Sequence, residues 1–138
     1  MEQPIKVNIS ATINAPVEKV RKCWSTPADI MQWNSASPDW HTPRAENDLR
    51  TGGAFYSRME AKDGSFGFDF TGIYDEVIPH KYIAYTMPDG RQVKTTFTAK
   101  GNATEIETLF DAETQNPVEM QRGGWQAILD NFKKYTEQ

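Results

Sequence analysis

Apolar and polar residues alternate strictly over residues 5–13. Isoleucine, valine and alanine occupy the odd positions, whereas lysine, asparagine, serine and threonine occupy the even ones. A period of two is typical of a β-strand that buries one of its faces. We therefore expect the first element of the chain to be a strand over these residues.

The pattern then changes to helical spacing. Pro16 suits the first turn of a helix, because its missing N–H would have no partner there anyway. The stretch TPAD, residues 26–29, combines a capping hydroxyl, a proline and an acid, and resembles a capping box. Two short helices are expected, the second ending near Trp33. The apolar face of the first consists of Val17, Val20 and Trp24.

Six strand-like runs follow, separated by turns rich in glycine, aspartate and asparagine. Closely spaced hairpin signals of this kind predict an antiparallel meander. The runs cover residues 43–49, 54–61, 65–77, 81–87, 92–99 and 104–111.

The clearest helical pattern closes the chain. Asn116 can cap this helix, Pro117 fits its first position and Glu119 its third. Its apolar residues recur at helical spacing and are Val118, Trp125, Ile128, Leu129, Phe132 and Tyr135. The order of elements predicts one α+β domain over residues 1–138, in which a curved antiparallel sheet wraps around the last helix.

The stretch MQWNSASPDWHTP, residues 31–43, has neither a helical nor a strand period and is interpreted as a loop. It contains Trp33, Trp40 and His41. Because large aromatic side chains are costly to leave in water, we expect them to cover something apolar. They either plug a filled core or rim a cavity that opens there.

Gly123 and Gly124 lie inside the predicted long helix, where each costs about 1 kcal/mol relative to alanine. This pair indicates either a close approach of helix and sheet or space for a ligand beneath the sheet, and both alternatives stand. A cavity would also account for several methionines, because flexible thioethers fill irregular apolar spaces. These are Met31, Met59, Met87 and Met120.

Composition narrows the classes of protein. The chain is 38% hydrophobic and 25% charged, as globular proteins are. Its net charge of -4 disfavours nucleic acid and anionic lipid as partners. Cys23 is the single cysteine and is interpreted as a buried, unreactive thiol. With no signal-peptide pattern and no stretch apolar enough to span a membrane, we expect a cytoplasmic location.

Few residues in the sequence suggest a catalytic or metal-binding site. Two isolated histidines, His41 and His80, do not suggest a metal site, and we expect neither a metal nor a cofactor. No serine lies in a nucleophile elbow, so no catalytic residue is assigned. Asp69 is expected to be exposed or to pair with a base such as Lys94 on a neighbouring strand.

Four segments resemble a known group of proteins. INAPVEKVRKCWSTPADIMQW is similar to the opening of the START-like helix-grip (SRPBCC) superfamily. NDLRTGGAFYSRM, GIYDEVIPHKYIAYTM and GGWQAILDNFKKY resemble successive motifs of the branch named after the activator of the heat-shock chaperone ATPase. The motifs occur in the right order and cover nearly the whole chain, as in small single-domain bacterial members.

The resemblance implies a ligand cavity inside the grip of the sheet. It makes Trp33, Trp40 and His41 residues of the rim or lid. The interior would be lined by Phe55, Met59, Phe68, Phe70, Tyr74, Tyr85, Phe97, Met120, Trp125 and Leu129.

Three functions are weighed, because members of this superfamily bind lipids, hormones or polyketides and some are cyclases. The first is binding of a small, largely hydrophobic molecule in the aromatic cavity. The second is a cyclase- or hydrolase-type enzyme that uses His41 or a cavity carboxylate as general base. The third is a module that interacts with a chaperone ATPase, although the eukaryotic activators carry a further N-terminal domain that this chain does not match.

Overall fold

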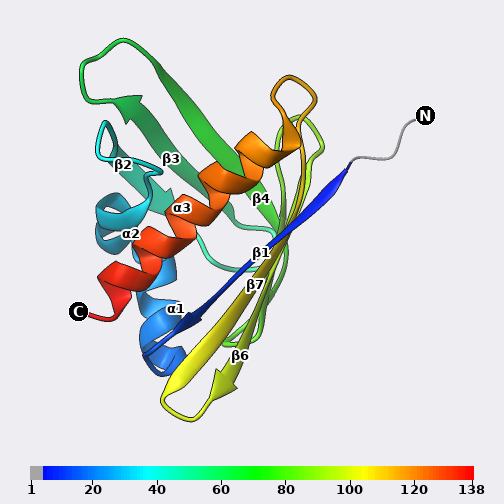
Figure 1. The fold of residues 1–138 in the computed structure, drawn as a ribbon. Coiled ribbons are helices and arrows are strands. Elements are labelled where there is room, and N and C mark those ends of the chain that lie inside the picture. The colour runs from blue at the N-terminus through cyan, green and yellow to red at the C-terminus, as the bar shows by residue number, and fades with distance from the viewer. Residues whose placement is uncertain (1–4) are drawn as a thin grey trace.

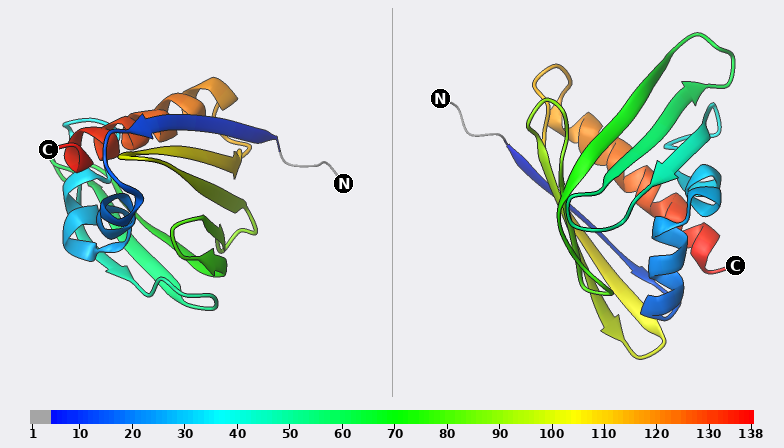
Figure 2. Two further views of the ribbon diagram at one scale, coloured as in Figure 1. Left: turned by 90° about the horizontal axis from the view of Figure 1, so that it is seen from below. Right: turned by 180° about the vertical axis from the view of Figure 1, so that it is seen from behind.

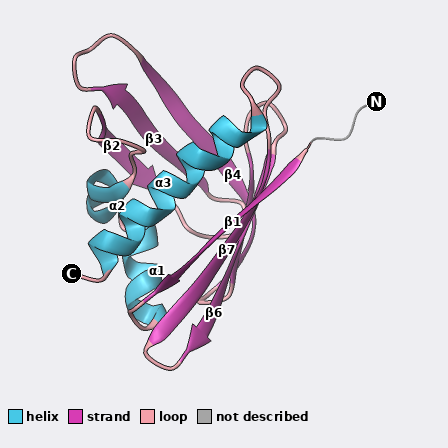
Figure 3. Cartoon of the chain, in the orientation of Figure 1, coloured by secondary structure: helices cyan, strands magenta, loops and turns pink. Residues whose placement is uncertain are grey.

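The structure, a computed structural model, describes residues 5–138. It confirms the predicted α+β class, with one curved antiparallel sheet and a long last helix (Figures 1 and 3). The elements are β1 (Lys6–Ile13), α1 (Val17–Ser25), α2 (Pro27–Trp33), β2 (Trp40–Asn47), β3 (Ala54–Ala61), β4 (Gly67–Ile78), β5 (Tyr82–Thr86), β6 (Gln92–Lys100), β7 (Ala103–Asp111) and α3 (Val118–Thr136).

The seven strands follow the order β1-β7-β6-β5-β4-β3-β2. Strands β2 to β7 form the predicted meander, and β1 pairs antiparallel with β7 at the far edge. Register irregularities interrupt β2 between His41 and Arg44, and β4 between Tyr74 and Glu76. Such bulges bend a strand and increase its local twist, which helps this sheet to curl.

Helix α3 crosses the concave face of the sheet diagonally (Figure 1). It packs chiefly against β1, whereas α2 packs against β2. The views in Figure 2 place α1 and α2 beside the C-terminal part of α3, at one end of the sheet. Three helices therefore cover the concave face at one end of the sheet. At the other end, only the first half of α3 covers it.

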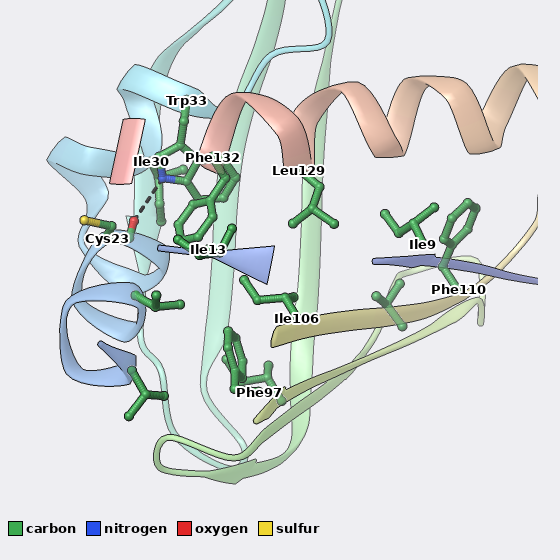
Figure 4. Close-up of a cluster of buried hydrophobic side chains, with 14 of the residues drawn as sticks. Ile9, Ile13, Cys23, Ile30, Trp33, Phe97, Ile106, Phe110, Leu129 and Phe132 are labelled. Carbon is green, nitrogen blue, oxygen red and sulfur yellow. Dashed lines mark hydrogen bonds between the residues drawn. The ribbon is translucent and has the colours of Figure 1, made fainter. Parts of the chain in front are cut away.

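The closed end holds a solidly packed core. Phe132 of α3 is fully buried and meets the rings of Trp24 and Trp33 edge-on, with ring centroids 5.0 and 4.9 Å away. The indole Nε1 of Trp33 donates a hydrogen bond to the carbonyl oxygen of Cys23 at 2.9 Å, drawn in Figure 4. Cys23 is buried there, as expected.

The predicted end of the second short helix near Trp33 is confirmed, whereas the interpretation of the following residues as a loop up to Pro43 is wrong at its C-terminal end. Helix α2 extends to Trp33, and β2 begins at Trp40, so only residues 34–39 are irregular. Trp40 and His41 pair in register with Ala61 and Glu60 of β3. Pairing with a neighbouring strand fixes these residues, although their own sequence has no strand period.

The predicted caps also need correction. Thr26 makes no side-chain cap at α2, and α3 begins at Val118 with Pro117 in the capping position. Gln121 organises the start of α3 in place of Asn116. Its amide accepts the N–H of Glu113 at 2.8 Å and donates to the Asn116 carbonyl oxygen at 2.8 Å.

Candidate ligand-binding cavity

A cavity of about 350 Å³ lies between the concave face of the sheet and α3. It forms because α3 rests on β1 and on the short helices, so the inner faces of β3 to β6 stay partly uncovered. Nine of the residues expected at the rim or interior line it: Trp33, Phe55, Met59, Phe68, Phe70, Tyr74, Tyr85, Trp125 and Leu129.

Aromatic rings make up much of the wall. Trp125 of α3 stacks on Phe110 of β7, with ring centroids 4.1 Å apart and an interplanar angle of 10°. It also meets the edge of Phe70 at 6.2 Å, so the indole faces the sheet as predicted, although it is only partly buried. On the opposite wall, Phe55 meets Tyr85 edge-on at 4.6 Å.

The alternation of β4 explains how this wall is built. Phe68 and Phe70 are two residues apart, so both point to the concave side. Gly72, the next inward position, leaves room for the Phe55 ring from β3. A Cβ at Gly72 would lie 2.7 Å from Cε1 of Phe55, so only glycine lets the two strands share this aromatic cluster.

The two glycines of α3 do not serve close packing. A Cβ built on Gly123 or Gly124 would meet no atom within 4 Å. The alternative of a close helix–sheet approach is therefore wrong, and this turn of α3 borders open space. That space is not the cavity, because neither glycine lines it, so the pair does not make room for a ligand there.

A few polar groups interrupt the apolar lining. The Tyr74 hydroxyl donates to Asn47 Oδ1 at 2.5 Å, and Asn47 in turn donates to the Ser25 carbonyl oxygen at 2.7 Å. Burial raises the pKa of Tyr74 and of Tyr85 well above the usual tyrosine range. Both hydroxyls therefore stay protonated and can donate hydrogen bonds at neutral pH.

Other lining residues were not expected at the cavity from the sequence. They include Ser57, Thr95 and Arg91. A signal for them exists in the strand period. Ser57 is two residues from Phe55 and from Met59 and so lies on the inward row of β3. Arg91 comes directly before β6 and is in phase with Val93 and Thr95, so it continues the inward row of that strand.

Trp40 and His41 line a different hollow, a surface groove between the residues around the α2–β2 connection and α3. The structure therefore does not gather Trp33, Trp40 and His41 around one opening. Trp40 still lies next to the cavity, because its ring is 6.1 Å from that of Phe68. His41 Nε2 lies 3.7 Å from Glu60 Oε1, outside the cavity lining.

Two residues expected in the interior are elsewhere. Met120 is 65% exposed, and the expectation that it lines the interior is wrong. Phe97 is buried, but it belongs to the filled core, where its ring meets Trp24 at 5.4 Å.

The polar candidates outside the cavity have structural partners. Asp69 is exposed, as expected, but pairs with β3 and not with Lys94. It accepts hydrogen bonds from Tyr56 at 2.7 Å and from Arg58 at 3.2 Å, which lower the pKa of its carboxyl. Within residues 5–138, no group of three or more His, Cys, Asp or Glu residues is placed to hold a metal ion. No helix in this range could cross a membrane.

These features define an α+β helix-grip domain with an aromatic cavity between sheet and helix. The sequence model of the family described as Activator of Hsp90 ATPase homolog 1-like protein matches residues 14–137. The chain belongs to this family. No match was found among curated proteins.

Solved structures agree with this assignment. An AHSA1-like protein from Aeromonas hydrophila is 44% identical, with a TM-score of 0.89 over 96% of this chain and 92% of that one. A protein from Cytophaga hutchinsonii is 52% identical, with a TM-score of 0.84 over the same shares. The Aha1 dimer from Colwellia psychrerythraea, at 15% identity, 96% coverage of each chain and a TM-score of 0.74, shares the fold.

Proposed function

We propose that this protein binds a small, largely apolar molecule in the cavity between the sheet and α3. The observation that carries the proposal is the cavity itself, about 350 Å³ in volume and walled by aromatic rings. Protein interiors are normally packed without such voids, and ligand sites start at about 300 Å³. An apolar guest would contribute about 0.8 kcal/mol for each methylene that it buries.

The mouth is proposed to lie beside β4. Phe68 lines the cavity and is nevertheless 42% exposed, so it belongs both to the wall and to the surface. Its contact with Trp40 supports a place for Trp40 at the rim. A role of His41 in ligand binding stays a prediction, because His41 does not line the cavity.

Binding is favoured over catalysis in this cavity. A general base must reach the proton that it removes, and His41 does not line the cavity. Among residues 5–138, Glu46 is the one acid on the lining, and its Oε2 is 2.8 Å from Arg44 Nη2 on the exposed side of β2. Neither residue offers a titratable group poised inside the apolar space.

Native mass spectrometry of gently purified protein tests the proposal. We expect an adduct of small-molecule mass that is lost on denaturation. A titration with an apolar, environment-sensitive dye gives a second readout, in which saturable binding is expected.

A variant that fills the cavity makes this test specific. Ser57 is buried on the lining and is small, so Ser57→Leu places a larger side chain in the space. It should abolish dye binding, whereas Ser10→Leu, at an exposed position of β1, should not. Equal dye binding by both folded variants would place the dye elsewhere and count against the cavity.

A second candidate function rests on an exposed aromatic cluster formed by Trp40, Phe66 and Phe68. Phe66 is 61% exposed at the β3–β4 turn, and its ring is 6.0 Å from Trp40 and 6.3 Å from Phe68. Exposed aromatic groups of this kind are typical of contacts with partners. Given the name of the family, the partner to test is an Hsp90-type chaperone.

The chaperone candidate has a direct assay. The ATPase rate of the chaperone should rise on addition of this protein and should rise less with Phe66→Ser. Ser57→Leu, which changes the cavity and not this surface, should still stimulate. An ATPase rate that does not respond to the wild-type protein would rule this function out.

A further inference from the structure

One charged side chain continues the inward row of β6. Val93, Thr95 and Phe97 are buried on the concave face, while the residues between them are exposed. Arg91 is two residues before Val93 and falls on the same face, where it lines the cavity. It is the one lysine or arginine on the lining within residues 5–138.

The guanidinium of Arg91 is held in place by one side-chain hydrogen bond, and its other donor atoms are free of partners in the described part of the chain. Its Nε donates to Asp89 Oδ2 at 2.7 Å, which fixes the side chain at the β5–β6 turn. Within residues 5–138, neither Nη atom of Arg91 makes a hydrogen bond. The nearby carboxylate of Glu113 is engaged elsewhere, because it accepts the N–H of Asn116 at 2.8 Å. Two donors in a fixed fork are thus free, and an arginine fork matches the geometry of a carboxylate.

A second unpartnered donor lies on the neighbouring strand. Tyr85 pairs in register with Val93, so it is a diagonal neighbour of Arg91 on the same face of the sheet. Diagonal positions are about 7–8 Å apart, within reach of long side chains. The Tyr85 hydroxyl has no hydrogen bond to the rest of the described chain, unlike that of Tyr74. Two polar groups without full partners therefore occur together in an otherwise apolar lining.

We infer that the ligand of the proposed function carries an anionic group, such as a carboxylate, which Arg91 binds through its two free Nη donors. The Tyr85 hydroxyl donates a further hydrogen bond to the same group. The apolar part of the ligand then extends along the aromatic wall towards Trp125 and Leu129. The ligand class is an acidic amphiphile, such as a fatty acid. This inference rests on the proposed function and adds the chemistry of the ligand's head group.

Two ligands that differ only in their headgroup separate recognition of the anionic group from binding of the apolar chain. Decanoate and decanol have the same chain length and differ in charge at pH 7.5, so their affinities can be compared by calorimetry or by displacement of a dye. Arg91→Gln should weaken decanoate binding about tenfold or more, because a charged hydrogen-bonded contact is lost. It should change decanol binding by less than about threefold, because the apolar contacts of the chain are kept.

Two further variants control this experiment. Arg91→Lys keeps a positive charge but lacks the fork of two Nη donors, so it should recover only part of the lost affinity for decanoate. Lys94→Gln makes the same change of net charge at an exposed position of β6 and should leave both affinities as in the wild type. Thermal melts followed by circular dichroism establish that each variant is folded.

The outcomes distinguish this inference from the function on which it rests. If both molecules bind and Arg91→Gln weakens both equally or neither, the anionic headgroup is refuted while an apolar site remains. If Arg91→Lys binds decanoate as tightly as the wild type, a positive charge alone suffices, and the assigned role of the two Nη donors is refuted. If neither molecule binds to the wild-type protein, the proposed function fails together with the inference.

Discussion

Replacing the two glycines of α3 by alanine tests directly whether this part of the helix borders open space. Gly123 and Gly124 are the sixth and seventh residues of the 19-residue α3 helix, well inside it. If another segment packed closely against these glycines, an alanine side chain would clash with it and destabilise the fold. If the space is open, alanine should stabilise, because glycine is the poorer helix former.

The magnitude follows from the surroundings of each added methyl group. No atom lies within 4 Å of a Cβ at either position, so there is no steric cost to subtract. Each Gly→Ala change should then raise the free energy of unfolding by about 0.5–1 kcal/mol. The double variant should gain about 1–2 kcal/mol, and its melting temperature should rise by several degrees.

Gly72→Ala is the matched control, since it makes the same chemical change in a strand. Its Cβ would lie 2.7 Å from the Phe55 ring and 3.1 Å from the Thr86 carbonyl oxygen, so this variant should be less stable than the wild type. Urea denaturation followed by circular dichroism gives all the values. Destabilisation by Gly124→Ala, in a variant that still folds, would show that another part of the chain packs on α3 and would refute the open flank.

Three further predictions concern two residues that line the cavity, Trp125 and Tyr74, and Asp111 at the end of β7. Trp125→Ala should lower the free energy of unfolding by about 2–3 kcal/mol, because one side of the indole faces the cavity. Phe132→Ala, at a fully buried position, should lower it by about 3–5 kcal/mol. Equal losses for the two variants in urea denaturation would mean that the cavity is filled. Tyr74→Phe removes a 2.5 Å hydrogen bond and should cost about 1–2 kcal/mol in the same assay, and no loss would show that this bond does not stabilise the fold. Burial acts to raise the pKa of Asp111, but hydrogen bonds, above all from Lys6 Nζ at 2.6 Å, outweigh it and lower that pKa. The stabilisation by Asp111 is therefore present above its unfolded pKa of about 4 and is lost as pH falls through the lowered folded value. Asp111→Asn should be destabilising at pH 7, with a smaller deficit in acid, and a deficit independent of pH would contradict this linkage.

The order of strands and helices could be predicted because each element carries its own period. The alternation over residues 5–13 fixes β1, and helical spacing around Trp125 fixes the face of α3 that meets the sheet. The same reasoning failed for Met120. It is five residues before Trp125, a rotation of about 140° around an α-helix, so it lies away from the sheet. A stricter use of the helical period would have excluded it.

Other features depend on contacts between distant segments, which no local period records. Trp40 and His41 are in a strand only because β3 pairs with them. Phe97 is in phase with the cavity residues of β6, yet α1 brings Trp24 against it and fills the space around it. Which inward residues line a void and which line a packed core is decided by where the helices rest, and not by the strand pattern alone.

The most direct test of the central claim is to locate a bound apolar molecule by NMR. Titration of isotope-labelled protein with decanol should shift the methyl signals of cavity residues such as Ile83, Ile128 and Leu129 in a saturable manner. Signals of the surface groove, represented by the methyl groups of Met31 and Ala127, should stay in place. Saturable shifts confined to the groove, or no shifts at either site, would contradict the account.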